Sequence, residues 1–156
     1  MKKILWSLLF LATALNAGAQ PSNRSAATQF PGAYAPKYAQ TDPSQLRDAA
    51  MRIAASMDEG KFADMWTSAS KSMQSKIKKK EFVKRTGEMR KKLGPAVGRS
   101  WIVIHREIGG GAGLPAGQYA SVEFELATAN GAPVKELVSF TLDADGVWRL
   151  VGYAVR

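Results

Sequence analysis

The sequence contains no cysteine and only one histidine, His105. Without cysteine the chain has no disulfide bond, no thiolate nucleophile, no cysteine-ligated zinc and no lipid-modified cysteine of the bacterial lipoprotein type. A single histidine does not make a metal site by itself, so we expect no metal. We expect no cofactor either. Any folded domain must be held together by packing, and the hydrophobic content of 46% is sufficient for a core.

The chain also lacks an apolar run of the roughly 20 residues that a membrane-spanning helix needs. Its longest apolar stretch, Ile4–Leu15, follows two lysines and precedes the small residues 17–19. These three parts predict a secretory signal peptide over residues 1–19, cleaved between Ala19 and Gln20. The predicted location is therefore the periplasm or the medium, where nucleotides and nucleic acid are not ordinary partners.

Residues 20–41 are rich in proline, serine, alanine and glutamine, which predicts a flexible linker. Residues 42–156 have the length of one domain. Apolar residues first recur at helical spacing, in one stretch that begins at Asp42-Pro43 and ends near Gly60. We expect a second helical stretch over residues 62–73 and a third over residues 77–93, which ends at Gly94-Pro95.

The period then changes to two, which is typical of strands. The four predicted strands cover residues 100–108, 118–128, 135–142 and 147–155. Turn residues separate them at 130–133 and 143–146, and the glycine-rich segment 109–113 fits a hairpin tip. Because helices precede strands, we predict an α+β fold with the N-terminal helices packed on one face of a curled four-stranded antiparallel sheet.

Strand 147–155 is apolar on both faces, and so is the start of strand 100–108. A dimer interface or a ligand pocket is one explanation, and coverage by the N-terminal arm is the other. The aromatic residues of the domain are expected in the core, and those that would line a ligand pocket between helices and sheet are Phe62, Trp66, Phe124, Phe140 and Trp148.

Nine lysines and arginines lie between residues 76 and 92, where only Glu81 and Glu88 oppose them. This local excess equals the whole positive excess that remains once Lys2 and Lys3 are removed. Such a face attracts anionic lipid head groups or cell-wall polymers, although it also suits an ordinary solvated helix. The predicted contacts are Lys78, Lys79, Lys80, Lys84, Arg85, Lys91 and Lys92. The scarcity of arginine and of interleaved aromatics disfavours nucleic acid.

Catalysis is the alternative. If alternation holds, His105 shares a strand face with Trp101, Val103 and Glu107, and Glu123 and Glu125 lie together on the next strand. A histidine beside a glutamate can act as a general base on a small substrate. A regular solvent-exposed face accounts for the same pattern.

Several segments together resemble the bacterial exported family known as domain of unknown function 4019, over about residues 45 to 155. The segments that carry the resemblance are 57–62 with Trp66, 69–70, 90–99, 114–119, 122–124, 136–138 and 145–153. The family usually has an aromatic residue between the second and third helices, which residues 75–77 lack. The resemblance implies an exported α+β domain of cystatin-like or nuclear-transport-factor-like outline, without an assigned activity.

The sequence thus predicts an exported, non-enzymatic binding module for a protein or small-molecule ligand. Its basic helix would face an anionic membrane or cell-wall surface, and a homodimer would form through the open sheet face. The alternative is a small enzyme that uses His105 and a glutamate.

Overall fold

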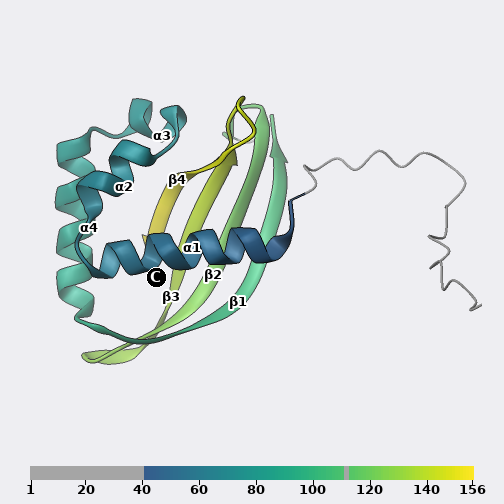
Figure 1. Cartoon of the computed structure of the whole chain (residues 1–156). Helices are drawn as coiled ribbons and strands as arrows, with labels where there is room; N and C mark the ends of the chain where they lie inside the picture. Colours follow the sequence, from purple (N-terminus) through teal and green to yellow (C-terminus); the bar gives the residue numbers. More distant parts are fainter. Residues whose placement is uncertain (1–40, 111–112) are drawn as a thin grey trace, which may run out of the picture. The chain divides into compact units, whose positions relative to one another are not determined.

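Helices come first and strands second in the structure, a computed structural model that describes residues 41–110 and 113–156 (Figure 1). Within these residues four helices precede one open four-stranded antiparallel sheet, which confirms the predicted α+β fold. The predicted signal peptide, the Ala19–Gln20 cleavage site and the linker up to residue 40 lie outside the described residues. No helix in the described part is long and apolar enough to cross a membrane.

The first helix, α1 (Pro43–Asp58), begins and ends as its sequence predicts. The Asp42 side chain accepts a hydrogen bond of 2.8 Å from the Ser44 N–H, which caps the helix, and Gly60 follows the helix with a φ of 73°. Its buried residues are Leu46, Ala50, Ala54 and Met57. They recur at helical spacing, so one side of α1 faces the sheet.

The second predicted helix is in fact two short ones, α2 (Phe62–Ser68) and α3 (Lys71–Lys76). The chain is extended at Ala69 and Ser70, and the Ser70 hydroxyl accepts a hydrogen bond of 3.2 Å from the Met73 N–H. The Ser70 N–H donates to the Leu150 carbonyl oxygen at 2.9 Å. The prediction of one helix over 62–73 was wrong because a serine N-cap interrupts a continuous apolar stripe.

The last helix, α4 (Lys79–Leu93), buries Phe82, Thr86 and Arg90 at four-residue spacing. It ends at Gly94, whose φ of 75° stops the helix as predicted.

The strands are β1 (Ala96–Gly109), β2 (Gly117–Thr128), β3 (Gly131–Leu142) and β4 (Trp148–Val155), and each pairs with its sequence neighbour in the order β1-β2-β3-β4. The β3–β4 turn falls at the predicted place: the Asp143 N–H donates to the Val147 carbonyl oxygen at 3.0 Å, and Gly146 has a φ of 77°. The β2–β3 turn is shorter than predicted, because Thr128 already pairs with Gly131.

The β1 register shifts between Trp101 and Val103, where a β-bulge interrupts alternation. Trp101 pairs with Phe124, which faces the helices, whereas His105 pairs with Ser121 on the opposite face. The expectation that His105 and Trp101 share a face was therefore wrong. A second shift lies in the β3–β4 pairing, because Ser139 pairs with Gly152 and Phe140 with Leu150. The extra residue, Val151, belongs to β4, the strand that looked apolar on both sides.

The hydrophobic core lies between the helices and one face of the sheet. Figure 1 shows α1 crossing the inner face of the curved sheet, with α4 along its side. The Leu46, Met57 and Phe82 side chains pack there against Phe124 and Phe140 of the sheet. Within residues 41–110 and 113–156, no helix packs on the outer side of α4 or on the other face of the sheet.

Candidate functional site

The basic residues predicted to contact an anionic surface all lie on α4 or directly before it, and all are exposed: Lys78, Lys79, Lys80, Lys84, Arg85, Lys91 and Lys92. Lys80, Lys84 and Lys91 are four and seven positions apart, so they share one side of the helix. We call these three residues the lysine stripe. The stripe lies opposite the side that buries Phe82 and Thr86, and therefore points away from the domain.

One basic residue of this region belongs to the interior instead. Arg90 retains only 8% of its side-chain exposure, and its guanidinium forms ion pairs with Asp58 of α1 and, at 3.5 Å, with Glu136 of β3. Arg90 was counted in the positive excess of residues 76–92 but not among the predicted surface contacts, and the structure places it in the interior.

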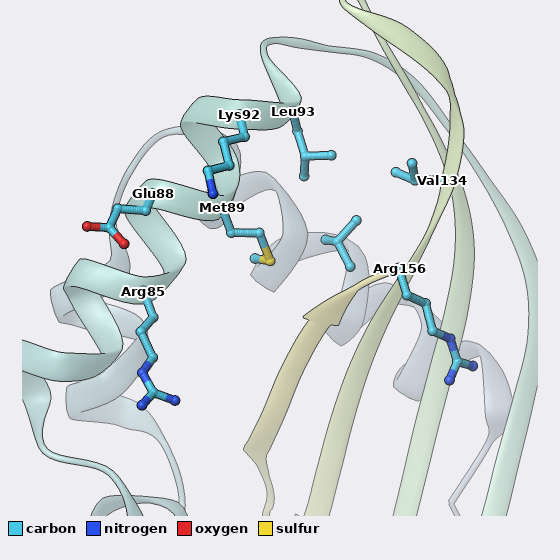
Figure 2. A pocket seen from close by; sticks show the side chains of 8 residues that line it. Arg85, Glu88, Met89, Lys92, Leu93, Val134 and Arg156 are labelled. Atoms are coloured by element: carbon cyan, nitrogen blue, oxygen red, sulfur yellow. The ribbon is translucent and has the colours of Figure 1, made fainter.

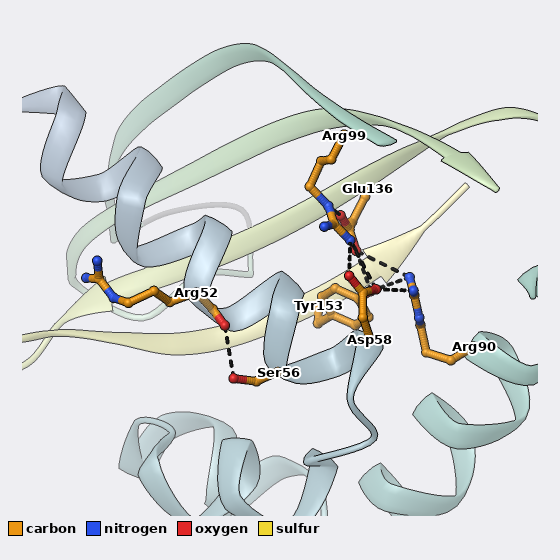
Figure 3. A network of polar contacts seen from close by, with 7 residues as sticks. All are labelled: Arg52, Ser56, Asp58, Arg90, Arg99, Glu136 and Tyr153. Carbon is orange, nitrogen blue, oxygen red and sulfur yellow. Dashed lines mark hydrogen bonds and ion pairs between the residues drawn. The ribbon is translucent and has the colours of Figure 1, made fainter. Parts of the chain in front are cut away.

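Arg90 is part of a buried polar network that also contains Asp58, Arg99, Glu136 and Tyr153 (Figure 3). Arg99 of β1 donates to both carboxylates, at 3.1 Å to Asp58 Oδ2 and 3.2 Å to Glu136 Oε1. The Tyr153 hydroxyl donates to Glu136 Oε1 at 2.6 Å. Two arginines therefore balance two carboxylates, and five side chains from α1, α4 and three strands meet at one point.

Burial and charge shift the pKa values in this network. Burial of the Tyr153 phenol raises its pKa, and the neighbouring Glu136 carboxylate raises it further. Burial opposes the charge of Arg99, but the hydrogen bonds and charges of Glu136 and Asp58 outweigh it, so the pKa of Arg99 is raised. These shifts keep the Arg99 guanidinium charged and the Tyr153 phenol neutral.

Sequence reasoning did not identify this network, although the sequence carried a sign of it. Glu136 alternates with Val134, Val138 and Phe140, so it occupies a core position of β3. Arg90 follows Phe82 and Thr86 at helical spacing, which places it on the buried side of α4. A charged residue at a core position requires a partner of opposite charge.

An apolar groove of about 460 Å³ runs beside α4, between the helix and the end of the sheet where β3 begins and β4 ends (Figure 2). Its floor consists of four partly exposed side chains: Met89 and Leu93 of α4, Val134 of β3 and Val155 of β4. The floor therefore presents only apolar side-chain atoms to the groove.

The rim of the groove is charged. Arg85, Glu88 and Lys92 stand on the helix side, and Arg156 stands on the sheet side (Figure 2). Arg85 is paired with Glu81 at 2.6 Å, and Arg156 with Glu123 at 3.1 Å. Lys92 forms no ion pair with another residue of the described part, and is thus the rim cation most available to a ligand.

The aromatic residues predicted to line a ligand pocket lie in the core or against it. Phe124 and Phe140 are 0% and 1% exposed, and Phe62, Trp66 and Trp148 pack partly buried around the same core. The Trp66 indole donates to the Ile77 carbonyl oxygen, and the Trp148 indole to the Thr41 hydroxyl at 3.0 Å. The structure brings these residues together as packing groups, while Met89, Leu93, Val134 and Val155 line the groove instead.

His105 lies in a separate, smaller depression of about 140 Å³, whose polar lining comes from the outer sheet face. Glu107, Ser121 and Ser139 line it as well. His105 forms no hydrogen bond with another described residue, so its imidazole is not oriented as a general base usually is.

The two glutamates predicted beside His105 have different surroundings. Glu125 is exposed, whereas Glu123 is buried beneath the side chains of Lys135 and Arg156. The hydrogen bond from Lys135 lowers the pKa of Glu123; burial works against this and the Arg156 hydrogen bond adds to it. Glu123 is therefore an ion-pair partner. No cluster of three or more metal-ligating side chains occurs among the residues that the structure describes.

Comparison with known proteins gives one family. A family model described as "Protein of unknown function (DUF4019)" matches residues 49–153, which is most of the described domain. Among curated proteins, none matches the chain.

Proposed function

Because this chain belongs to the DUF4019 family, whose function is unknown, we propose a function from its own geometry. We propose that it is an exported, non-enzymatic binding module that places the lysine stripe of α4 against an anionic surface of the cell envelope. The signal peptide predicted over residues 1–19 supports the location.

The lysine stripe carries the proposal. Lys80, Lys84 and Lys91 are exposed on one side of the helix, and their neighbours Lys78, Lys79 and Lys92 extend the same positive region. A lysine near an anionic membrane contributes about 1 kcal/mol of binding free energy. Salt at 0.1 M largely screens this attraction at distances beyond about 10 Å. Three lysines on one side of the helix can attract anionic head groups without a specific pocket.

Vesicle sedimentation tests this proposal. We expect the protein to sediment with vesicles that contain phosphatidylglycerol and not with pure phosphatidylcholine vesicles, and to be released by high salt. The triple variant Lys80→Gln, Lys84→Gln, Lys91→Gln should bind about a hundredfold more weakly, since it loses about 1 kcal/mol per lysine.

The matched control removes the same number of charges elsewhere. Arg52→Gln, Lys61→Gln and Lys71→Gln change three exposed basic residues that lie outside α4. Equal loss of binding in the two triple variants would mean that net charge alone, and not the stripe, causes attachment. Equal binding to the two vesicle types would refute the proposal.

Export has its own test. Mass spectrometry of the protein recovered from the envelope fraction or the medium should give a chain that begins at Gln20. A chain that retains residues 1–19 and stays in the cytoplasm would contradict the predicted location.

A further inference from the structure

The groove beside α4 points to a more specific ligand than a charged surface. We propose that it holds the acyl chain of an anionic lipid, with the lipid head group between Lys92 and Arg156. This inference rests on the proposed function, since it names the molecule that the basic helix would meet at the envelope.

The floor of the groove fits a hydrocarbon chain. Met89, Leu93, Val134 and Val155 come from three elements and leave apolar surface exposed in one hollow, where a bound apolar group would remove it from water. The volume of about 460 Å³ falls in the range of about 300–1,000 Å³ typical of small-molecule pockets.

The same floor fits a peptide poorly. An extended peptide carries a backbone donor and acceptor at nearly every residue, and these lose free energy when they are buried without partners. The four floor side chains offer no donor and only the weak acceptor sulfur of Met89. A hydrocarbon chain has no polar atoms to satisfy.

The rim determines the charge of the head group. Lys92 and Arg156 stand on opposite sides of the groove, and Lys92 has no ion-pair partner in the described part of the chain. Glu88 is the one acidic residue of the rim, so it opposes an anionic ligand. The lysine stripe on the same helix adds positive potential along the approach.

Isothermal titration calorimetry with alkyl phosphates tests the assignment on protein purified from the envelope or medium. The probes are hexyl, octyl and decyl phosphate below their micelle concentrations, with inorganic phosphate and octyl glucoside as head-group and chain controls. We expect affinity to rise by up to about fourfold for each added methylene that the groove buries. Inorganic phosphate should bind more weakly than every alkyl phosphate.

Variants locate the site. Met89→Gln should remove most of the dependence on chain length, while Met51→Gln, which changes a partly exposed methionine of α1, should preserve it. Lys92→Gln should weaken the binding of the alkyl phosphates and leave the affinity for octyl glucoside unchanged. Glu88→Gln should strengthen the binding of the alkyl phosphates. Circular dichroism verifies that each variant is folded.

Three results would overturn the inference: no binding of the alkyl phosphates, affinity that does not depend on chain length, or equal chain-length dependence in Met89→Gln and the wild-type protein. These results are independent of the vesicle test. If the lysine stripe fails to bind vesicles but alkyl phosphates still bind the groove, the surface proposal is lost and the acyl-chain site stands. If vesicles bind and alkyl phosphates do not, the surface proposal stands and the acyl-chain site is lost.

Discussion

Glu136 occupies the most constrained position among the charged residues of the domain. It is 0% exposed, and Arg90, Arg99 and Tyr153 all contact its carboxylate. A buried ionic group of this kind contributes little when complete, yet removal of one partner leaves the others charged and without compensation.

We therefore predict that Glu136→Gln lowers the free energy of unfolding by about 3–5 kcal/mol, because Arg90 and Arg99 would share Asp58 alone. Urea denaturation measures the change. Glu125→Gln, an exposed glutamate on β2, serves as the control and should stay within about 0.5 kcal/mol of the wild-type protein. Similar effects in both variants would contradict the role assigned to the network.

Tyr153 gives a prediction about pH. Its folded-state pKa is raised by burial and by Glu136, whereas an unfolded tyrosine ionises near pH 10. Above about pH 10 the unfolded chain loses the phenolic proton and the folded chain keeps it, so stability falls as pH rises. Tyr153→Phe should reduce the decrease in the free energy of unfolding with rising pH. Urea denaturation between pH 8 and pH 11 measures both slopes, and identical slopes would refute the shift.

At the scale of elements, α4 contains two glycines of different effect: one inside the helix that lowers its stability, and one at its end that the turn requires. Gly87 lies inside the helix, where a Cβ would only make ordinary contact with the Phe62 ring. Gly94 ends the helix at positive φ, and a Cβ there would overlap the Asn130 side chain.

Gly87→Ala should therefore stabilise the domain by about 0.5–1 kcal/mol, since alanine favours the helix, whereas Gly94→Ala should destabilise it. Thermal unfolding followed by circular dichroism compares the two substitutions. A stabilised Gly94→Ala variant would mean that the positive φ is not required at that turn.

The elements also show what the sequence can and cannot predict. The start of α1 at Asp42-Pro43, its end near Gly60 and the stop of α4 at Gly94 depend on local backbone chemistry, and the structure confirms them. The break at Ser70 was missed because the apolar stripe continues through it.

Tertiary features were harder to predict. The bulge at Trp101–Val103 reverses which residues share a face, and no turn residue marks it. The groove depends on the distance between α4 and the side chains of Val134 and Val155. The hydrophobic periodicity of the sequence does not predict this distance. The basic residues of the candidate site could be predicted because charge is visible in the sequence, whereas the apolar floor beside them could not.

At the scale of the whole molecule, the sheet face that points away from the helices is the one predicted to form a homodimer. His105, Ser121 and Ser139 form a cross-strand row on this face, and Glu123 pairs with Lys135 at 2.8 Å. These polar groups interrupt the apolar area that the predicted homodimer would need. Ile102 of the edge strand β1 is 44% exposed, but it lies at a bulge, which hinders pairing with another strand.

We accordingly predict a monomer at micromolar concentration, measured by size-exclusion chromatography with light scattering. A dimer mass would contradict this prediction. Ile102→Lys would then separate two interfaces: a dimer that it abolishes uses the β1 edge, and a dimer that it leaves intact uses the open face.

The position of Arg90 has a mechanical consequence. The lysine stripe occupies one side of α4 and Arg90 the other, with ion pairs to Asp58 of α1 and Glu136 of β3. If a surface binds the stripe as proposed, a force on α4 would also load the ion pairs of Arg90 with two elements that are distant in the sequence. The ion pairs of Arg90 hold α4 to the sheet. A force that detaches α4 from the sheet must therefore also break the buried network.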